Sequence, residues 1–387
     1  LTSSALSLWA CTSAIITGKL TPDGRPLLLK HRDTGELNNR VEKFTGKKYD
    51  FIGLVDSPST GGCVWAGTNG VGFSIVNTAS YNLKNDDVEE MDQEGLLMFK
   101  ALGECKTLKD FERFLDKYPR PMRVEANFGV IDAEGGAAYY EVNNHKWNKL
   151  DVNDPNVAPN GYFIVTNFSY TGREDEGMGY IRNCNTTYNV ENYVIKEGGK
   201  VDPQWIFENI SRSFYHSLLE VDLRKDQELA SGWFIDQDFV PRRSSSASMV
   251  FQGVKPGEDA SKTVMWAILG YPPLGVAVPM VVANGENIPS FMVKSEGNEN
   301  ALMCDMVLEL KKNGMKLYAT TPDSSASKIT DEEMKGGIVA VIGNEGNGVS
   351  KEIIEKCSDR ITIKMDGRAE SLNAAAAASI IMWEMTR

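Results

Sequence analysis

The sequence predicts an α+β protein in which a long antiparallel part is followed by a short part with a parallel sheet. From about residue 11 to 290, apolar runs of strand length such as "RPLLLKHR", "VGFSIVNT" and "KTVMWAILG" are separated by turns rich in Gly, Asn and Asp. Beyond about residue 300, helices alternate with uninterrupted apolar strands such as "GGIVAVIG", which is typical of parallel sheets. We therefore expect two units, at residues 11–300 and 301–387, and two layers of antiparallel sheet covered by helices in the first.

The composition limits the classes of protein that fit. The chain has 387 residues, of which 42% are apolar and 24% charged, so it can bury a sizeable core and is longer than one average domain. Its net charge of -12 argues against a broad basic surface for nucleic acid. Six cysteines form no CxxC or CxxxC pair, and no run of 18 apolar residues occurs, so we expect neither a metal centre nor a membrane span.

Turn and capping residues predict individual elements. "FGVIDAEGGAAYYEV" predicts a hairpin, because two apolar runs flank the turn "DAEGG". "KTLKDFERFLDKY" predicts a helix in which Thr107 and Asp110 form a near capping box. "DPQWIFENISRSFYHSLLEV" predicts another helix, opened by Asp202 and Pro203. In the tail we expect helices at "NALMCDMVLELKKNG", "SKEIIEKC" and "SLNAAAAASIIMWEM" and strands at "MKLYAT", "GGIVAVIG" and "RITIKM".

Cys11 is the first candidate for chemistry. Residues 1–10 end in small and apolar residues like the tail of a secretory signal, and we interpret them as the remnant of a leader. Cleavage after Ala10 makes Cys11 the first residue, with a nucleophilic sulfur and a free α-amine. Because an α-amine titrates near neutral pH, it can act as the general base for its own thiol. One residue then supplies both halves of a catalytic pair.

The residues after Cys11 resemble a known family. "CTSAIITGKLTPDGRPLLLKHRD", "WAGTNGVGFSIVNTASYN", "ANFGVIDAEGGAAYYE" and "IVTNFS" occur in the order found in amino-terminal-nucleophile (Ntn) hydrolases of the choloylglycine hydrolase, penicillin acylase and acyl-CoA:6-aminopenicillanate acyltransferase group. The resemblance covers about residues 11–300. It implies a four-layer αββα sandwich that hydrolyses a linear amide, or transfers its acyl group, through a thioester on Cys11 and without a cofactor.

The same resemblance assigns roles to further residues. Cys11 is expected to be nucleophile and base, and Asp33 to hold the environment of the amine or the thiol. Asn167 is expected to donate to the oxyanion, together with Asn77 or a backbone N–H beside it. Arg182, in "GYIRN", is expected to support the site electrostatically.

The cation beside the nucleophile has two candidates. The family's Arg-x-x-Asp pattern places Lys30 of "KHRD" at the usual arginine position, and Arg32 lies two residues further on. Either cation can lower the pKa of a neighbouring thiol, so the choice between them stays open.

The identity of the small acyl-amide substrate is also open, since bile-salt conjugates, penicillins and N-acyl amino acids all agree with the resemblance. Either water or an amine agrees with it as the acceptor of the acyl group.

A different use of Cys11 is a lipid anchor. "LSLWAC" is close to a bacterial lipoprotein signal, in which a small residue precedes the cysteine and an aliphatic residue lies three positions before it. Leu8 and Ala10 comply, whereas Trp9 is bulky for the intervening position. Lipidation consumes the amine and the sulfur that catalysis needs, so this alternative predicts a noncatalytic lipoprotein.

The tail resembles a second family. "IGNEGNGVS", "ITIKMDGRAESLN" and the Ala-rich last helix resemble the second and third motifs of SpoU/TrmH-type (SPOUT) RNA ribose methyltransferases, over about residues 305–387. The resemblance implies part of a trefoil-knotted α/β domain that binds S-adenosylmethionine, and a homo-oligomer packed through Ala374–Ala378. The residues that it places at the cofactor pocket are Gly343, Glu345, Gly346, Ile363, Ser371, Leu372 and Asn373.

The tail lacks parts of such an enzyme. Residues 150–310 contain no Asn-x-Gly-x-x-x-Arg motif, whose arginine serves the target ribose in this family. From residue 314 on, nine Lys or Arg face eleven Asp or Glu, which gives little attraction for RNA. We expect a methyltransferase remnant with an incomplete cofactor pocket. The alternative is RNA 2'-O-ribose methylation by the tail, the only part for which RNA is a candidate partner.

The two resemblances place a junction between unrelated families just before residue 311. The leader remnant predicts a periplasmic or secreted hydrolase, whereas a methyltransferase part is expected in the cytoplasm with its cofactor and RNA. The sequence therefore favours a join of two unrelated reading frames, by recombination or in assembly of the sequence, and a truncated start. A natural fusion with a degenerate dimerisation tail is the alternative.

Overall fold

The computed structural model describes residues 10–59, 61–225, 236–282, 288–313, 316–321, 326–331, 338–343, 348–349, 351–354, 357, 359–363 and 373–385. The chain falls into two units that divide between Asp305 and Met306. Helix α5 (Leu302–Asn313) begins in the first unit and continues into the second. Within the described ranges, no helix is both long and apolar enough to cross a bilayer.

Two antiparallel sheets form the centre of the first unit. The seven-stranded sheet is a meander of consecutive strands: β3 (Asn39–Phe44), β4 (Phe51–Asp56), β5 (Ala66–Asn69), β6 (Ser74–Ala79), β7 (Ala126–Ile131), β8 (Ala137–Val142) and β9 (Trp147–Asp151). The six-stranded sheet has the order β10 (Tyr162–Val165), β1 (Ala10–Ile16), β2 (Leu27–Asp33), β13 (Ser245–Gln252), β14 (Val264–Leu269) and β15 (Val278–Met280).

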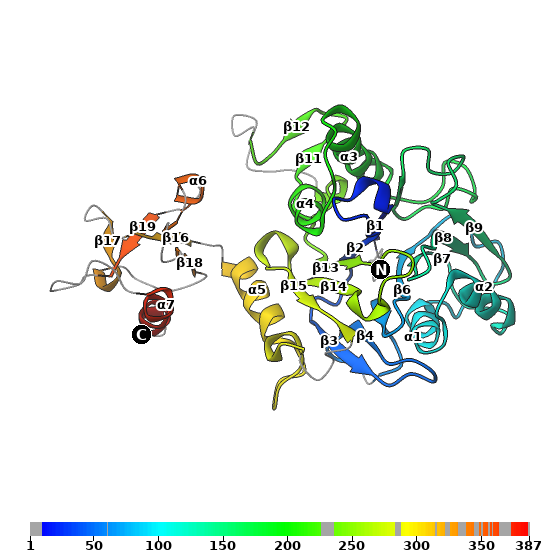
Figure 1. The fold of residues 1–387 in the computed structure, drawn as a ribbon, viewed down its shortest axis with the longest axis horizontal. Coiled ribbons are helices and arrows are strands. Elements are labelled where there is room, and N and C mark those ends of the chain that lie inside the picture. The colour runs from blue at the N-terminus through cyan, green and yellow to red at the C-terminus, as the bar shows by residue number, and fades with distance from the viewer. Residues whose placement is uncertain are drawn as a thin grey trace, which may run out of the picture. The chain divides into compact units, whose positions relative to one another are not determined.

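Helices cover the outer face of each sheet. Helices α1 (Glu94–Glu104) and α2 (Leu108–Lys117) share an apolar cluster with the seven-stranded sheet. Helices α3 (Tyr180–Glu191) and α4 (Pro203–Ile206) share another with the six-stranded sheet. The sheets face each other, since the Ser13 hydroxyl of β1 lies 2.7 Å from the Tyr139 hydroxyl of β8. The layers are therefore αββα, with the two sheets between the two helix pairs (Figure 1).

Local sequence signals explain several of these elements. The predicted hairpin forms between β7 and β8, and the Asp132 side chain closes its turn by accepting from the backbone N–H groups of Glu134 and Gly136. The predicted capping box is present at α2, where the side chain of each capping residue accepts from the backbone N–H of the other. Both predictions are confirmed.

The helix predicted over residues 202–221 is wrong beyond its first two turns. α4 continues through a π-helical turn at Phe207–Ser211 and ends, after which β11 (Tyr215–His216) pairs with β12 (Val221–Asp222). The Ser213 hydroxyl accepts from the backbone N–H of Tyr215 and from the Asn189 amide of α3. A serine that bonds the backbone in this way competes with helix continuation, and Asn189 of α3 binds the same hydroxyl where the helical turns end.

The second unit contains a parallel sheet, as predicted. Its strand order is β17 (Ser327–Lys328), β19 (Asp359–Thr362), β16 (Lys316–Thr320) and β18 (Ile338–Val341), and all pairs are parallel. Helices α6 (Lys351–Ile354) and α7 (Ala374–Met385) follow β18 and β19. A small core joins Tyr318, Ile329 and Ile361 to Ile381 of α7.

Candidate active site

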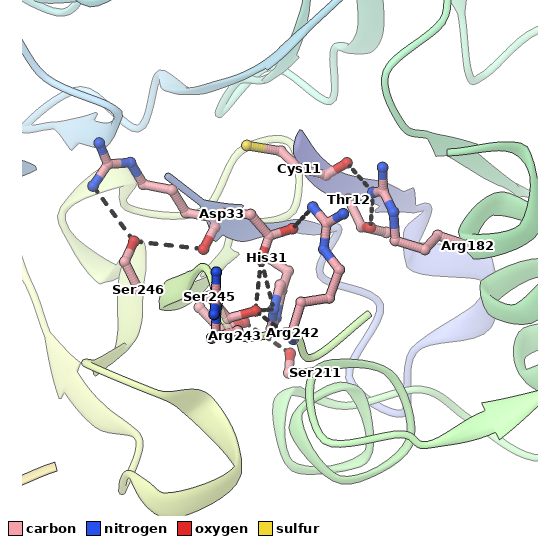
Figure 2. A network of polar contacts seen from close by, with 12 residues as sticks. Cys11, Thr12, His31, Asp33, Arg182, Ser211, Arg242, Arg243, Ser245 and Ser246 are labelled. Atoms are coloured by element: carbon pink, nitrogen blue, oxygen red, sulfur yellow. Dashed lines mark hydrogen bonds and ion pairs between the residues drawn. The ribbon is translucent and has the colours of Figure 1, made fainter. Parts of the chain in front are cut away.

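Cys11 is the second residue of β1, an interior strand of the six-stranded sheet. It is 6% exposed and lies opposite Arg32 of β2. Its backbone N–H donates to Asn167 Oδ1 over 3.0 Å, and its carbonyl oxygen accepts from Arg182 Nη1 over 2.7 Å. Figure 2 shows the sulfur directed away from Arg182. Side chains distant in sequence therefore hold both backbone polar groups of this residue.

Asn167 binds the nitrogen of Cys11. It follows β10, and its Oδ1 accepts from both the Cys11 N–H and Arg182 Nη2, while its Nδ2 donates to the carbonyl of Ala79 over 2.8 Å. The Nδ2 group is thus engaged in a bond to the backbone. Through its Oδ1, Asn167 is an acceptor that orients the Cys11 nitrogen, and its role as an oxyanion donor stays a prediction.

Arg182 reaches the site from the first turn of α3. The residue before this helix, Gly179, has φ +83, and a Cβ there would lie 2.4 Å from Arg182 Nη2. Glycine therefore allows both the left-handed turn and the passage of the guanidinium group. Arg182 also donates to Thr12 Oγ1 over 3.0 Å. Burial, the largest cause, and the nearby charge of Arg242 lower the pKa of Arg182 to about 10. Arg182 therefore carries its charge at neutral pH.

Asp33 lies one register step from Cys11, opposite Ala10. Its carboxylate binds Arg242 Nη2 over 2.6 Å and accepts from Ser245 Oγ over 2.5 Å (Figure 2). His31 Nε2 lies 2.8 Å from the same serine hydroxyl, and burial lowers the pKa of His31 to about 4, so this imidazole is neutral. In the part of the chain that the structure describes, the Asp33 carboxylate bonds to Arg242 and Ser245, and its expected role in the environment of the amine or the thiol stays a prediction.

The two candidate cations have different partners. Arg32 forms an ion pair with Asp56 over 2.8 Å and lies over the ring of Trp65 at 4.9 Å. Lys30 Nζ instead donates to Asn77 Oδ1 over 2.5 Å and to the Trp65 carbonyl over 2.6 Å. The predicted oxyanion donor Asn77 is therefore bound through its oxygen by Lys30, the residue at the family's arginine position.

The structure adds residues that sequence reasoning does not single out. Arg242 and Ser245 anchor Asp33, and both come from "PRRSSSAS" at the start of β13, more than 200 residues along the chain. Their only signal is an Arg pair before a Ser-rich strand. Glu94, at the start of α1, is buried, and burial raises its pKa to about 7.

Of the residues predicted at the cofactor pocket, three are described. Gly343 follows β18 and Ile363 follows β19, and because both strands are parallel neighbours of β16, the two residues lie at one edge of the sheet. A Cβ on Gly343 would lie 2.2 Å from the carbonyl carbon of Gly348. Asn373 Oδ1 accepts from the backbone N–H of Ala376, so it caps α7. Glu345, Gly346, Ser371 and Leu372 lie outside the described residues.

The first unit is thus an αββα sandwich with a buried cysteine at the start of an interior strand, which is the arrangement that the resemblance to Ntn hydrolases implies. Two solved structures that align with it are a variant of the conjugated bile acid hydrolase of Clostridium perfringens (12% identity, 71% of this chain, 93% of that chain, TM-score 0.43) and the Caenorhabditis elegans N-acylethanolamine-hydrolyzing acid amidase ortholog (14% identity, 70% of this chain, 99% of that chain, TM-score 0.40).

The carboxyl-terminal part of the chain is similar to SpoU-type methylases, since residues 298–383 match the model of the SpoU rRNA Methylase family. Over 81 residues, or 21% of this chain, the sequence is 37% identical to a tRNA (guanosine(18)-2'-O)-methyltransferase of Aquifex aeolicus strain VF5. The match spans 38% of that relative's length.

Proposed function

We propose that the first unit is a cysteine Ntn amide hydrolase or acyltransferase, active once the residues up to Ala10 have been removed. The observation that carries the proposal is the pair of contacts on Cys11, whose nitrogen is bound by Asn167 Oδ1 and whose carbonyl is bound by Arg182. An acceptor beside the nitrogen suits an α-amine that gains and loses a proton at a fixed place. The order of sequence motifs from Cys11 to Asn167 supports the same reading.

In the proposed reaction, the Cys11 thiol gives its proton to its own α-amine, and the sulfur attacks the carbonyl carbon of a linear amide. The resulting oxyanion is bound by Asn77 Nδ2 or a backbone N–H beside it. The α-amine returns the proton to the leaving nitrogen as the C–N bond breaks, and a thioester remains on Cys11. Water or a second amine then attacks the thioester, and the thiol is restored.

A cysteine substitution tests this function. We expect Cys11→Ala to lower the rate of amide cleavage by about 10³-fold or more, because the nucleophile is lost. The measurement is release of the amine from a panel of bile-salt conjugates, penicillins and N-acyl amino acids. Cys184→Ala is the matched control, since Cys184 is exposed and outside the site. A Cys11→Ala protein as fast as the parent on every cleaved amide contradicts the proposal.

For the second unit, the match to the SpoU family favours S-adenosylmethionine binding, with RNA 2'-O-methylation as the candidate activity. The described residues fit a nucleoside-type group at the carboxyl edge of the sheet, where the Gly343 and Gly348 backbones meet with no side chain between them. Gly343 and Ile363 would hold the group, which supplies the transferable methyl when bound.

Binding and transfer are measured separately for this unit. Titration calorimetry of the full chain with S-adenosylmethionine is expected to show binding that Gly343→Ala abolishes, because an added Cβ displaces the neighbouring backbone. Methyl incorporation into tRNA or rRNA tests the candidate activity. Binding without incorporation identifies a methyltransferase remnant, whereas no binding by the parent chain contradicts the proposed cofactor binding and the candidate activity.

A further inference from the structure

Lys30 lies on the same face of the sheet as Cys11. In the antiparallel register of β1 and β2, Cys11 is opposite Arg32 and Ser13 is opposite Lys30. Opposed residues and their second neighbours along a strand have side chains on one face. That face is directed at the seven-stranded sheet, because the Ser13 hydroxyl contacts Tyr139 there. Lys30 is 1% exposed, so its ammonium group lies between the sheets.

The contacts of Lys30 fix the orientation of the side-chain amide of Asn77. Its Nζ donates to Asn77 Oδ1 over 2.5 Å and to the Trp65 carbonyl over 2.6 Å. An ammonium group can only donate, so Asn77 must present its oxygen to Lys30, and its Nδ2 then faces the opposite way. Asn77 lies two residues before Ala79, whose carbonyl binds the same Asn167 that holds the Cys11 nitrogen. The amide is therefore on the strand segment next to the nucleophile.

Lys30 differs from Arg32 in its charge balance. The Arg32 guanidinium is compensated by the Asp56 carboxylate over 2.8 Å. No ion pair to a carboxylate is found for Lys30 among the described residues. Within the described part of the chain, Lys30 thus lacks the direct carboxylate partner that Arg32 has, and its ammonium group bonds to Asn77 and to the Trp65 carbonyl.

We propose that Lys30 is a positioning residue that holds the Asn77 carboxamide with Nδ2 toward the carbonyl oxygen of the substrate under attack by Cys11. The inference rests on the proposed amide hydrolysis. Donors that bind an oxyanion are effective because they are oriented before the reaction begins. Without the Lys30 ammonium, the carboxamide can rotate about its terminal bond and present its oxygen to the developing negative charge.

The titration of Lys30 supplies a second consequence of this arrangement. Burial, the largest cause, lowers the pKa of Lys30 to about 8. Negative charge at Cys11, Asp56 and Glu94 raises this pKa, and the charge of Arg32 lowers it. Above that pH the neutral amine can also accept a hydrogen bond, so it no longer fixes which end of the Asn77 amide faces it. The rate should therefore fall as pH rises through about 8. An arginine at this position stays protonated and should remove that alkaline limb.

Kinetics of the mature protein test the proposal. We expect Lys30→Met to lower kcat by about 10- to 100-fold with KM changed less than about 3-fold, and Asn77→Ala to lower kcat by about 100- to 1000-fold. The double variant should be no slower than Asn77→Ala alone, because Lys30 acts through Asn77. Lys30→Arg should shift the alkaline limb upward by at least about one pH unit. Lys117→Met, on the exposed side of α2, is the control.

Two kinetic results overturn the proposal: additive losses in the double variant, or an alkaline limb that stays near pH 8 in Lys30→Arg. A spectroscopic measurement decides the question without turnover. The side-chain ¹⁵N–¹H signals of Asn77, assigned by their absence in Asn77→Ala, should titrate near pH 8 in the parent and not in Lys30→Met. A flat signal in the parent overturns the inference. A titrating signal in a protein that cleaves no amide upholds the link between Lys30 and Asn77 and rejects the proposed function.

Discussion

Glu94 carries a buried carboxyl group within electrostatic reach of Lys30. Burial raises its pKa from 4.5 to about 7, so the folded protein binds this proton more tightly than the unfolded chain does. Its contribution to stability is complete below about pH 4.5 and is lost as pH rises through about 7. A pKa difference of this size corresponds to about 3 kcal/mol in the free energy of unfolding.

We therefore expect Glu94→Gln to raise the free energy of unfolding at pH 8 by about 2 to 3 kcal/mol and to leave it nearly unchanged at pH 4.5. Gln keeps the Oε1 that accepts from the backbone N–H of Glu125. Urea unfolding followed by tryptophan fluorescence is suitable, because six of the seven tryptophans precede residue 306. Glu134→Gln, at an exposed turn, is the control. Equal effects of Glu94→Gln at both pH values contradict the assignment.

Residues of the candidate site were predictable where they belong to local motifs. Cys11, Asn77, Asn167 and Arg182 were singled out from short runs of sequence, and the structure places the last two in direct contact with Cys11. The orientation of the Asn167 side-chain amide was not predictable, because it depends on partners distant in sequence such as the Ala79 carbonyl. Arg242 was missed for a related reason: its bond to Asp33 joins positions that are 209 residues apart.

At the scale of elements, strands and caps were predictable and the ends of irregular helices were not. The capping box of α2 and the turn of the β7–β8 hairpin depend on residues within four positions of one another. The end of α4 instead depends on Asn189, which reaches across from α3 to the carbonyl of Asn209 and to Ser213. A helical pattern in the sequence carries no information about such a contact, so tertiary packing overrides it.

For the whole molecule, the sequence changes near residue 300 from successive strand-length runs to alternating helices and strands. This corresponds to a change from antiparallel to parallel sheets. The described structure divides at Asp305, inside the matched family region, which begins at residue 298. Helix α5 is therefore shared, and its first turn is fixed to the first unit by the bond from Cys304 Sγ to the Leu37 carbonyl. The periplasmic or secreted location of the hydrolase part stays a proposal, and it requires that the leader be removed.

The central claim is that Cys11 acts with its own free α-amine. The most direct measurement is the intact mass and amino-terminal sequence of the protein, expressed from its full upstream gene and quenched during incubation with an amide substrate. We predict a chain that begins at Cys11 and carries the acyl group of the substrate on the Cys11 sulfur. A chain that keeps the residues before Cys11, or that has a lipid on this residue, contradicts the account because the α-amine is then blocked.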